Sequence, residues 1–151
     1  MVGSKKFLFN WVVNGEVALG SIPNNKNDLE FLISQKIKVI FSLCEINDQK
    51  FFDDLKKRFR WEGMILPDHK SEQELDKNQI ISVISRIEKL REEGPLFLHC
   101  YASIERSPSI AIAWLIAAKK ISFNNAYDYI SQMHPTTNLL SSQIKAIRDL
   151  T

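Results

Sequence analysis

The sequence predicts an α/β fold in which helices cover both faces of a central sheet. Five apolar stretches have the length and composition of strands, at residues 9–13, 16–20, 37–43, 61–66 and 96–98. Stretches with helical spacing of apolar residues lie between or after them. Strands that alternate with helices are typical of α/β domains. In such sheets, ligands bind at the carboxyl ends of the strands.

The chain has 151 residues, enough to bury a core and suited to one domain over residues 1–151. With 44% hydrophobic and 25% charged residues, its composition is that of a soluble globular protein. The formal net charge of +2 is too small to indicate nucleic-acid binding. No apolar run approaches the ~20 residues that cross a bilayer. Residues 1–9 become polar too early for a secretory signal.

The two cysteines, Cys44 and Cys100, are too few and too far apart for a disulfide framework or a metal-ligand cluster. We therefore expect a cytoplasmic protein, since a reducing compartment preserves thiols. We also expect a monomer that needs no metal or cofactor and binds neither nucleic acid nor membranes.

In the first half of the chain, Asn14-Gly15 separates two apolar runs and predicts a β-hairpin over residues 9–20. A helix capped by Asn25 or Asn27 is expected to run to about Gln35. The strand at residues 37–43 follows, and it ends at Cys44.

A charged helix over about residues 48–58 precedes the strand at 61–66. Residues 71–74, Ser-Glu-Gln-Glu, have the pattern of a capping box and predict the start of a long amphipathic helix, which Gly94-Pro95 stops. Ser122 is expected to cap a helix that reaches Met133, and a last helix covers about residues 140–150.

The loop behind the strand at 96–98 holds the strongest chemical pattern. It begins at Cys100 and, after five residues, ends at Arg106, where an apolar helix starts with Pro108 in its first turn. A thiol becomes a good nucleophile at neutral pH only when its thiolate is stabilised, which a helix N-terminus and an arginine both do. The same groups suit a phosphate dianion. A thiolate in a phosphate cradle predicts a covalent phosphocysteine intermediate.

Two neighbours support this chemistry. Ser107 is placed to hydrogen-bond the thiolate or the leaving sulfur, and His99 is placed to hold the loop by hydrogen bonding. His99-Cys100, five residues and Arg106-Ser107 together resemble the signature loop of the cysteine-dependent protein tyrosine phosphatase superfamily. The Arg-Ser-Pro ending resembles its dual-specificity branch. Residues 11–12, 20–23 and 39–43 resemble, more loosely, the small atypical dual-specificity phosphatases.

The resemblance implies a three-layer fold with a mostly parallel five-stranded sheet. It also implies catalytic roles for Cys100, Arg106, Ser107 and His99. The loop between them would bind phosphate; its residues are Tyr101, Ala102, Ser103, Ile104, Glu105 and Arg106. One departure is Ser103, since the family usually has glycine there. A side chain at that position is expected to tighten the loop or slow turnover.

Hydrolysis of a phosphate ester also needs a proton donor for the leaving oxygen. The family's donor is an aspartate about thirty residues before the cysteine, and Asp68 lies 32 residues before Cys100, in Pro67-Asp68-His69. The alternative is that Asp68 is only a turn residue. Asp76 is the second candidate, although it falls in the predicted long helix and is expected to face solvent.

Four further residues each have more than one interpretation or a structural one. His69 orients Asp68, touches substrate or is a solvated loop residue. Gln143 lies near the hydrolytic water or on an exposed helix face. Cys44 could trap an oxidised Cys100 as a disulfide, but we favour a small buried hydrophobe. His134, before Pro135, is interpreted as a helix-end residue.

The loop composition favours phosphorylated proteins as substrates. Residues 101–105 contain no lysine, and Glu105 would repel a polyphosphorylated headgroup. The short chain has no room for the segment that deepens the pocket of strict tyrosine phosphatases, so phosphoserine and phosphothreonine should fit as well as phosphotyrosine. The alternatives are a non-catalytic phosphate-binding module and a phosphatase acting on a lipid or an RNA 5′-phosphate. The basic run at 56–60 could serve RNA but is expected to be a solvated face.

Overall fold

The central sheet has five strands in the order β1-β2-β5-β3-β4. Four of them are parallel, and only β1 runs antiparallel, as the first arm of the hairpin. The strands are β1 (Phe9–Val13), β2 (Val17–Gly20), β3 (Val39–Ser42), β4 (Arg60–Gly63) and β5 (Leu96–His99). This computed structural model describes residues 6–150. The predictions of a single domain over 1–151 and of no secretory signal at 1–9 therefore extend beyond the described residues.

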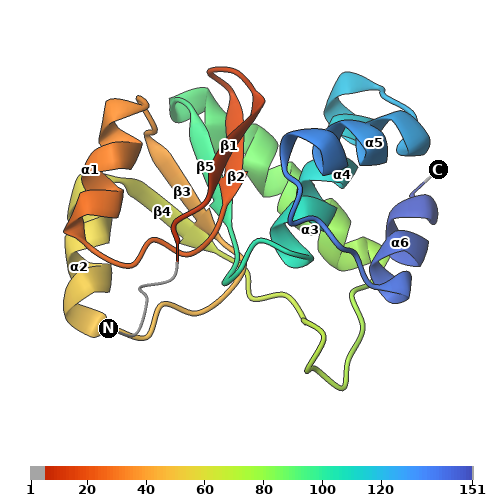
Figure 1. Cartoon of the computed structure of the whole chain (residues 1–151), viewed down its shortest axis with the longest axis horizontal. Coiled ribbons are helices and arrows are strands. Elements are labelled where there is room, and N and C mark those ends of the chain that lie inside the picture. Colours follow the sequence, from red (N-terminus) through yellow and green to blue (C-terminus); the bar gives the residue numbers. More distant parts are fainter. Residues whose placement is uncertain (1–5, 151) are drawn as a thin grey trace.

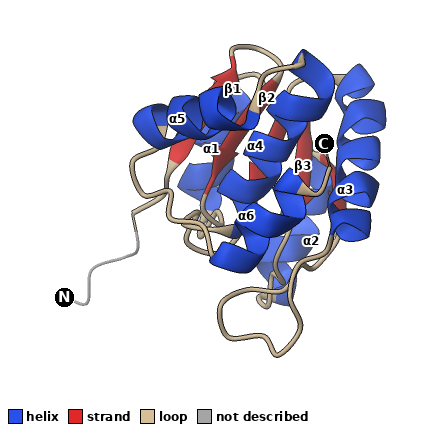
Figure 2. Cartoon of the chain, turned by 90° about the vertical axis from the view of Figure 1, so that its right-hand side faces the viewer, coloured by secondary structure: helices blue, strands red, loops and turns tan. Residues whose placement is uncertain are grey.

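Helices cover both faces of the sheet, which confirms the predicted three-layer α/β fold (Figure 1 and Figure 2). One face is covered by α1 (Lys26–Ser34) and α2 (Gln49–Arg58). The other is covered by a larger group: α3 (Lys77–Leu90), a 3₁₀ turn (Arg91–Glu93), α4 (Arg106–Lys119), α5 (Phe123–Met133) and α6 (Ser141–Arg148). No helix in the described part of the chain is long and apolar enough to span a membrane.

The strands divide their side chains between two cores because successive residues point to opposite faces. In β5, Leu96 and Leu98 pack toward α3 and α4, while Phe97 packs toward α1 and α2. All three are fully buried, since β5 lies between β2 and β3 and has helices on both sides.

The parallel strands bring their carboxyl ends to one edge of the sheet. Ser42, the last residue of β3, lies in register with His99, the last residue of β5. The chain beyond β4 continues alongside, where the Leu66 N–H donates to the Leu43 carbonyl. Cys44, Asp68 and Cys100 therefore leave the sheet at the same edge, as the rule for ligand sites in α/β sheets requires.

The predicted start of the long helix is wrong. Residues 71–74 lie in a loop, and α3 begins at Lys77 behind the N-cap Asp76, whose capping-box partner is Gln79. The hydroxyl of Ser71 is used elsewhere, because it accepts the Asp68 N–H and donates to the Asp68 carboxylate. The following loop therefore delays the helix by one turn and a half.

Other predicted boundaries differ by smaller amounts. Asn25, rather than Asn27, caps α1, and Ser122 caps α5 as expected. β4 ends at Gly63, so Ile65 lies outside the strand with 59% of its surface exposed. The basic run at 56–60 spans the exposed end of α2 and the first residue of β4, and it pairs with acidic neighbours through Lys56–Asp53, Arg58–Asp54 and Arg60–Glu93 contacts.

Replacement of Asp76 by alanine is expected to lower the free energy of unfolding by about 1 kcal/mol, the usual cost of losing an N-cap side chain. Urea unfolding measures this. Glu74→Ala, in the exposed loop just before the cap, is the matched control and should change stability by less than about 0.5 kcal/mol. Equal losses in the two variants would contradict the assignment of the helix start to Asp76.

Candidate active site

Cys100 lies directly behind β5, at the open end of the sheet, and its side chain is buried. The next six residues curl back so that α4 begins beside the sulfur. The backbone N–H of Ser107 lies 3.4 Å from Cys100 Sγ and the Ser107 hydroxyl lies 3.2 Å from it. Since no side chain caps this helix, its N-terminal N–H groups remain available for an anion in the loop.

Ser103 occupies a left-handed backbone conformation, with φ of +58°. This conformation costs an L-residue about 1 kcal/mol or more, which explains why glycine suits the position. The side chain is nevertheless fully buried, and its hydroxyl lies 2.8 Å from the Ser107 hydroxyl and 2.9 Å from His134 Nε2. These polar contacts of its hydroxyl thus hold Ser103 in the loop.

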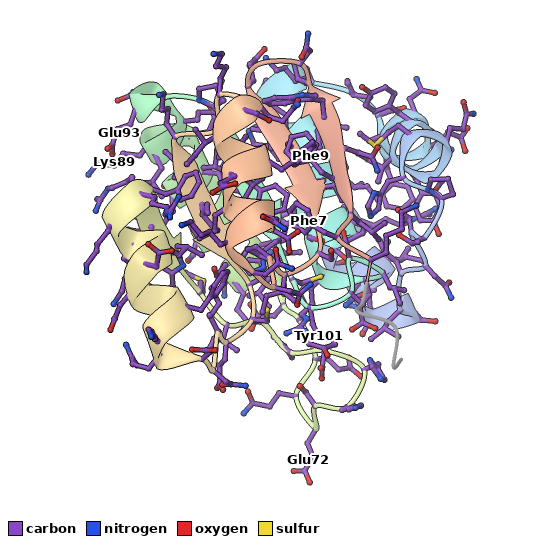
Figure 3. All side chains as sticks on the ribbon, turned by 60° about the vertical axis from the view of Figure 1, so that its left-hand side comes forward. Phe7, Phe9, Glu72, Lys89, Glu93 and Tyr101 are labelled. Atoms are coloured by element: carbon purple, nitrogen blue, oxygen red, sulfur yellow. The ribbon has the colours of Figure 1, made fainter. Side chains whose placement is uncertain are left out.

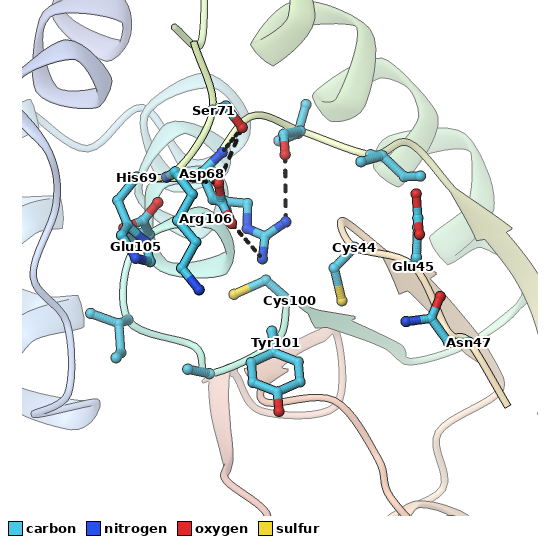
Figure 4. Close-up of a pocket in the computed structure, with 15 residues that line it drawn as sticks. Cys44, Glu45, Asn47, Asp68, His69, Ser71, Cys100, Tyr101, Glu105 and Arg106 are labelled. Atoms are coloured by element: carbon cyan, nitrogen blue, oxygen red, sulfur yellow. Dashed lines mark hydrogen bonds and ion pairs between the residues drawn. The ribbon is translucent and has the colours of Figure 1, made fainter. Parts of the chain in front are cut away.

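Arg106 closes the other side of the cradle (Figure 4). Its Nη1 donates weakly to the carbonyls of Leu43 and Leu66, which follow β3 and β4. Among the described residues, Arg106 Nε has no hydrogen-bond partner although it is buried. A buried guanidinium N–H without a partner is costly in a folded protein, and an oxyanion in the cradle would satisfy it.

Asp68 reaches the same pocket from the loop after β4, with Oδ2 3.9 Å from Arg106 Nη2. Burial raises the pKa of Asp68. This effect is outweighed by hydrogen bonds from the Lys70 N–H and the Ser71 hydroxyl and by the positive charge of Arg106, so the pKa lies below its ordinary value of 3.8. Without a ligand, the carboxyl is therefore ionised and faces the arginine.

Glu105 links the phosphate loop to the loop that carries Asp68. Its largely buried carboxylate lies 3.3 Å from His69 Nδ1 and also accepts the Gln143 amide at 3.4 Å. Gln143 is itself buried, and its amide oxygen accepts the Leu140 N–H. Gln143 is thus buried behind Glu105, so the interpretation as an exposed helix residue is wrong, while a role near the hydrolytic water stays a prediction. His69 does line the pocket, next to Asp68.

His99 is fully buried and holds the loop from below, as the sequence predicts. The Cys100 carbonyl can only accept, so His99 Nδ1 carries the ring proton and donates to it at 3.2 Å. Nε2 therefore accepts the Ser42 hydroxyl at 2.6 Å, and this hydroxyl in turn accepts the indole N–H of Trp61. Burial lowers the pKa of His99 to about 4, so the ring is neutral at pH 7.

Cys44 is buried and lines the same pocket as Cys100, since β3 and β5 are neighbours. Its sulfur lies 4.0 Å from His99 Nδ1. Its burial agrees with the favoured interpretation as a small hydrophobe, and a disulfide with Cys100 stays a prediction. Asp76, the second candidate acid, caps α3 and lies outside the pocket lining.

The pocket has a volume of about 510 Å³, and Cys100 and Arg106 form its floor (Figure 4). Three exposed apolar side chains line it: Ile65, Tyr101 and Ile104, at 59%, 57% and 42% exposure. Tyr101 projects from the end of the molecule that also carries the loop with Glu72 at its tip (Figure 3). The charged lining residues have both signs: Glu45, Asp68, Lys70, Glu105 and Arg106.

Sequence reasoning missed Trp61, Ser42 and Asn10 and assigned His134 only to a helix end. His134 does end α5, but its ring also contacts Ser103, 31 residues away, and Asn10, 124 residues away. No local spacing signals such contacts. The His134-Pro135 pair at the end of the predicted helix was the one feature of the sequence that drew attention to His134.

A nucleophilic thiol, a phosphate-sized cradle at a helix N-terminus and a facing carboxyl define a cysteine-dependent phosphatase site. The family model described as "Dual specificity phosphatase, catalytic domain" matches residues 17–150. The chain therefore belongs to the dual specificity phosphatase family.

Individual relatives match over shorter segments. A probable dual specificity protein phosphatase of Dictyostelium discoideum is 36% identical over 62 residues, which are 41% of this chain and 16% of that protein. Dual specificity protein phosphatase 5 of Homo sapiens is 42% identical over 50 residues, 32% of this chain and 13% of that protein. These matches thus cover less than a fifth of each relative's length.

Solved structures match over almost the whole chain at low identity, and they show the fold. The active form of Tk-PTP superposes with a TM-score of 0.80 at 20% identity and covers 94% of this chain and 95% of its own. DUSP15 gives 0.78 at 20% identity, with 94% and 86% covered. PTPMT1, solved in complex with PI(5)P, gives 0.78 at 16% identity, with 93% and 92% covered.

The buried neutral ring of His99 predicts a pH dependence of stability. Between pH 6.5 and about 4 the unfolded chain binds a proton at this residue and the folded chain does not, so stability falls on acidification, by up to ~3 kcal/mol over this range. Urea unfolding at pH 7 and pH 5 measures the slope. His99→Asn should weaken it, with a residual slope from His134, whose pKa burial also lowers. An unchanged slope in His99→Asn would refute the prediction.

Proposed function

We propose that this chain hydrolyses phosphomonoesters on phosphotyrosine, phosphoserine and phosphothreonine of proteins, through a phosphocysteine intermediate. The carrying observation is the pairing of Cys100 Sγ with the N-terminus of α4, opposite the unpartnered Nε of Arg106. The first arrangement stabilises a thiolate and the second fits an equatorial phosphate oxygen. Membership of the family supports phosphatase activity, and the pocket supports the narrower choice of substrate.

In the proposed first step, the Cys100 thiolate attacks phosphorus and the ester P–O bond breaks. Asp68 gives its proton to the leaving oxygen, while Arg106 and the loop N–H groups hold the charge that builds on the phosphoryl oxygens. In the second step, water attacks the phosphocysteine and the S–P bond breaks. The Asp68 carboxylate takes the proton from water, and the electron pair returns to sulfur, where Ser107 donates a hydrogen bond.

The contact between Asp68 and Arg106 has to change when a substrate enters. A bound phosphate dianion competes for the guanidinium and places negative charge beside the carboxyl. Both effects raise the pKa of Asp68 relative to its value in the empty pocket. Substrate binding itself would thus favour the protonated form that the first step needs.

The mixed charge of the lining supports a singly phosphorylated side chain as substrate. Beyond Arg106, the described lining contains one lysine, Lys70, and one histidine, His69, against three carboxylates. A polyphosphorylated headgroup or an RNA 5′ end would meet little positive charge there. The exposed Ile65, Tyr101 and Ile104 instead offer apolar contact to the residues that flank a phosphorylated side chain.

Hydrolysis of a small aryl phosphate without added metal is the direct test. The wild type should turn over, and Cys100→Ser should lose activity by more than about 10³-fold, because the hydroxyl is not ionised in this cradle. If the wild type binds phosphopeptide but does not hydrolyse the aryl phosphate, the enzyme hypothesis is wrong and the protein is a phosphate-binding module. Turnover of a lipid or RNA phosphate in preference to phosphopeptides would overturn the choice of substrate.

Removal of the acid should change the pH profile as well as the rate. Asp68 has to be protonated to act, and its pKa lies below 3.8 in the free enzyme, so its contribution to kcat/KM should fall as pH rises through the acidic range. Asp68→Asn should lose about 10²–10⁴-fold with an aryl phosphate and should lack this descending limb.

Asp76→Asn is the matched control for Asp68→Asn. Asparagine still caps α3, so this variant should keep the wild-type rate and pH profile. If Asp76→Asn loses the descending limb and Asp68→Asn keeps it, the role of general acid moves to Asp76.

A further inference from the structure

The hydroxyl of Ser103 stands in the middle of a buried chain of polar groups. On one side it contacts the Ser107 hydroxyl at 2.8 Å, and on the other it contacts His134 Nε2 at 2.9 Å. His134 Nδ1 lies 2.7 Å from the side-chain amide of Asn10 on β1. Ser103, Ser107 and His134 are almost completely excluded from solvent.

The direction of each hydrogen bond follows from the donors available. The Asn10 amide nitrogen can only donate, so His134 Nδ1 accepts and Nε2 carries the proton of the neutral ring. Burial lowers the pKa of His134 and keeps the ring in this neutral form. The Nε2–H is shared between the hydroxyl and the carbonyl of Ser103, and Thr136 donates to the same carbonyl.

The Ser103 hydroxyl accepts this proton and is left to donate its own to Ser107. The Ser107 hydroxyl has two acceptors within reach, Cys100 Sγ at 3.2 Å and the Gly20 carbonyl at 3.4 Å. The hydrogen bond that Ser103 donates occupies one lone pair of the Ser107 oxygen. The hydroxyl proton of Ser107 therefore points away from Ser103. Since an ionised sulfur is the stronger acceptor, every donor in the chain then points toward Cys100.

We propose that Ser103 and His134 are positioning residues that orient the Ser107 hydroxyl onto the sulfur of Cys100. The proposal rests on the proposed function, in which this sulfur is the nucleophile and the leaving group. When the S–P bond breaks, the electron pair goes to sulfur, and the oriented hydroxyl is already in place to stabilise it. The Ser103 hydroxyl then contributes to the function of the loop, and this contribution offsets the conformational cost of its left-handed backbone.

The test compares Ser103→Gly, His134→Ala and His134→Gln with the wild type. The first readout is the rate at which iodoacetamide alkylates Cys100 at pH 6, which needs no substrate and reports the reactive thiolate. Ser103→Gly should slow alkylation by about 3- to 10-fold, the value of one net hydrogen bond. With an aryl phosphate, kcat should fall by a similar factor and KM should stay unchanged, because the phosphate contacts remain.

The His134 variants separate orientation from packing. Glutamine keeps an N–H donor near the Nε2 position, so His134→Gln should retain more alkylation rate and kcat than His134→Ala. Ser109→Ala is the control, since it removes another buried hydroxyl of α4 that donates to the Glu105 carbonyl. It should leave alkylation unchanged.

In Ser103→Gly the relief of the left-handed backbone opposes the loss of the buried hydroxyl contacts, so this variant should unfold thermally close to the wild-type midpoint, and measuring that midpoint excludes unfolding as the cause of its losses. If Cys100 in Ser103→Gly is alkylated as fast as in the wild type or faster, and kcat is not lowered, the serine does not assist the loop and the proposal is wrong. Equal behaviour of His134→Ala and His134→Gln would also overturn it. A wild type inert toward aryl phosphate would refute the proposed function, while the alkylation series would still decide the positioning role.

Discussion

The contact between Cys100 and Ser107 is the constraint on which the site depends. The chain has to leave β5, enclose a space of phosphate size and start a helix with its first N–H groups beside the sulfur, all within seven residues. His99 ties the Cys100 carbonyl to β3 and β4 from below, and Ser103 ties the far side of the loop to α5. Cys100 is thus supported from both faces of the sheet.

The two sides of the pocket are built differently. The cradle side rests on the central strand and on α4, whose apolar residues fill the larger core. The side that carries Asp68 is a loop that contributes two buried residues, Leu66 and Leu75, to that core, with Met64 packed against it. Asp68 is positioned by local hydrogen bonds to Lys70 and Ser71 and by its attraction to Arg106, and Glu105–His69 links the two sides. Cys100 is held by packing and Asp68 mainly by polar contacts.

The sequence was informative where the signal was local. The Asn14-Gly15 hairpin, the order of strands and helices, and the Cys100–Arg106 loop all lie within short windows, and the structure contains them. The start of α3 was missed because two segments with capping potential lie five residues apart, and the loop hydrogen bonds of Ser71 decide between them. The contacts of His134 and Trp61 were missed because they join residues far apart in the chain, which only the tertiary fold brings together.

The exposed loop between β4 and α3 carries Asp68 but contributes little to the core. It leaves the body of the molecule, with Glu72 at its tip, and its two buried leucines lie near its ends (Figure 1 and Figure 3). Under the proposed function, substitutions within this loop would remove the proton donor without opening the core, and the residues that would bind phosphate would stay in place. Changes in a single surface segment could then convert an enzyme, which releases its substrate, into a binding protein, which retains it. Changes at Cys100 or Ser107 would instead disturb buried groups.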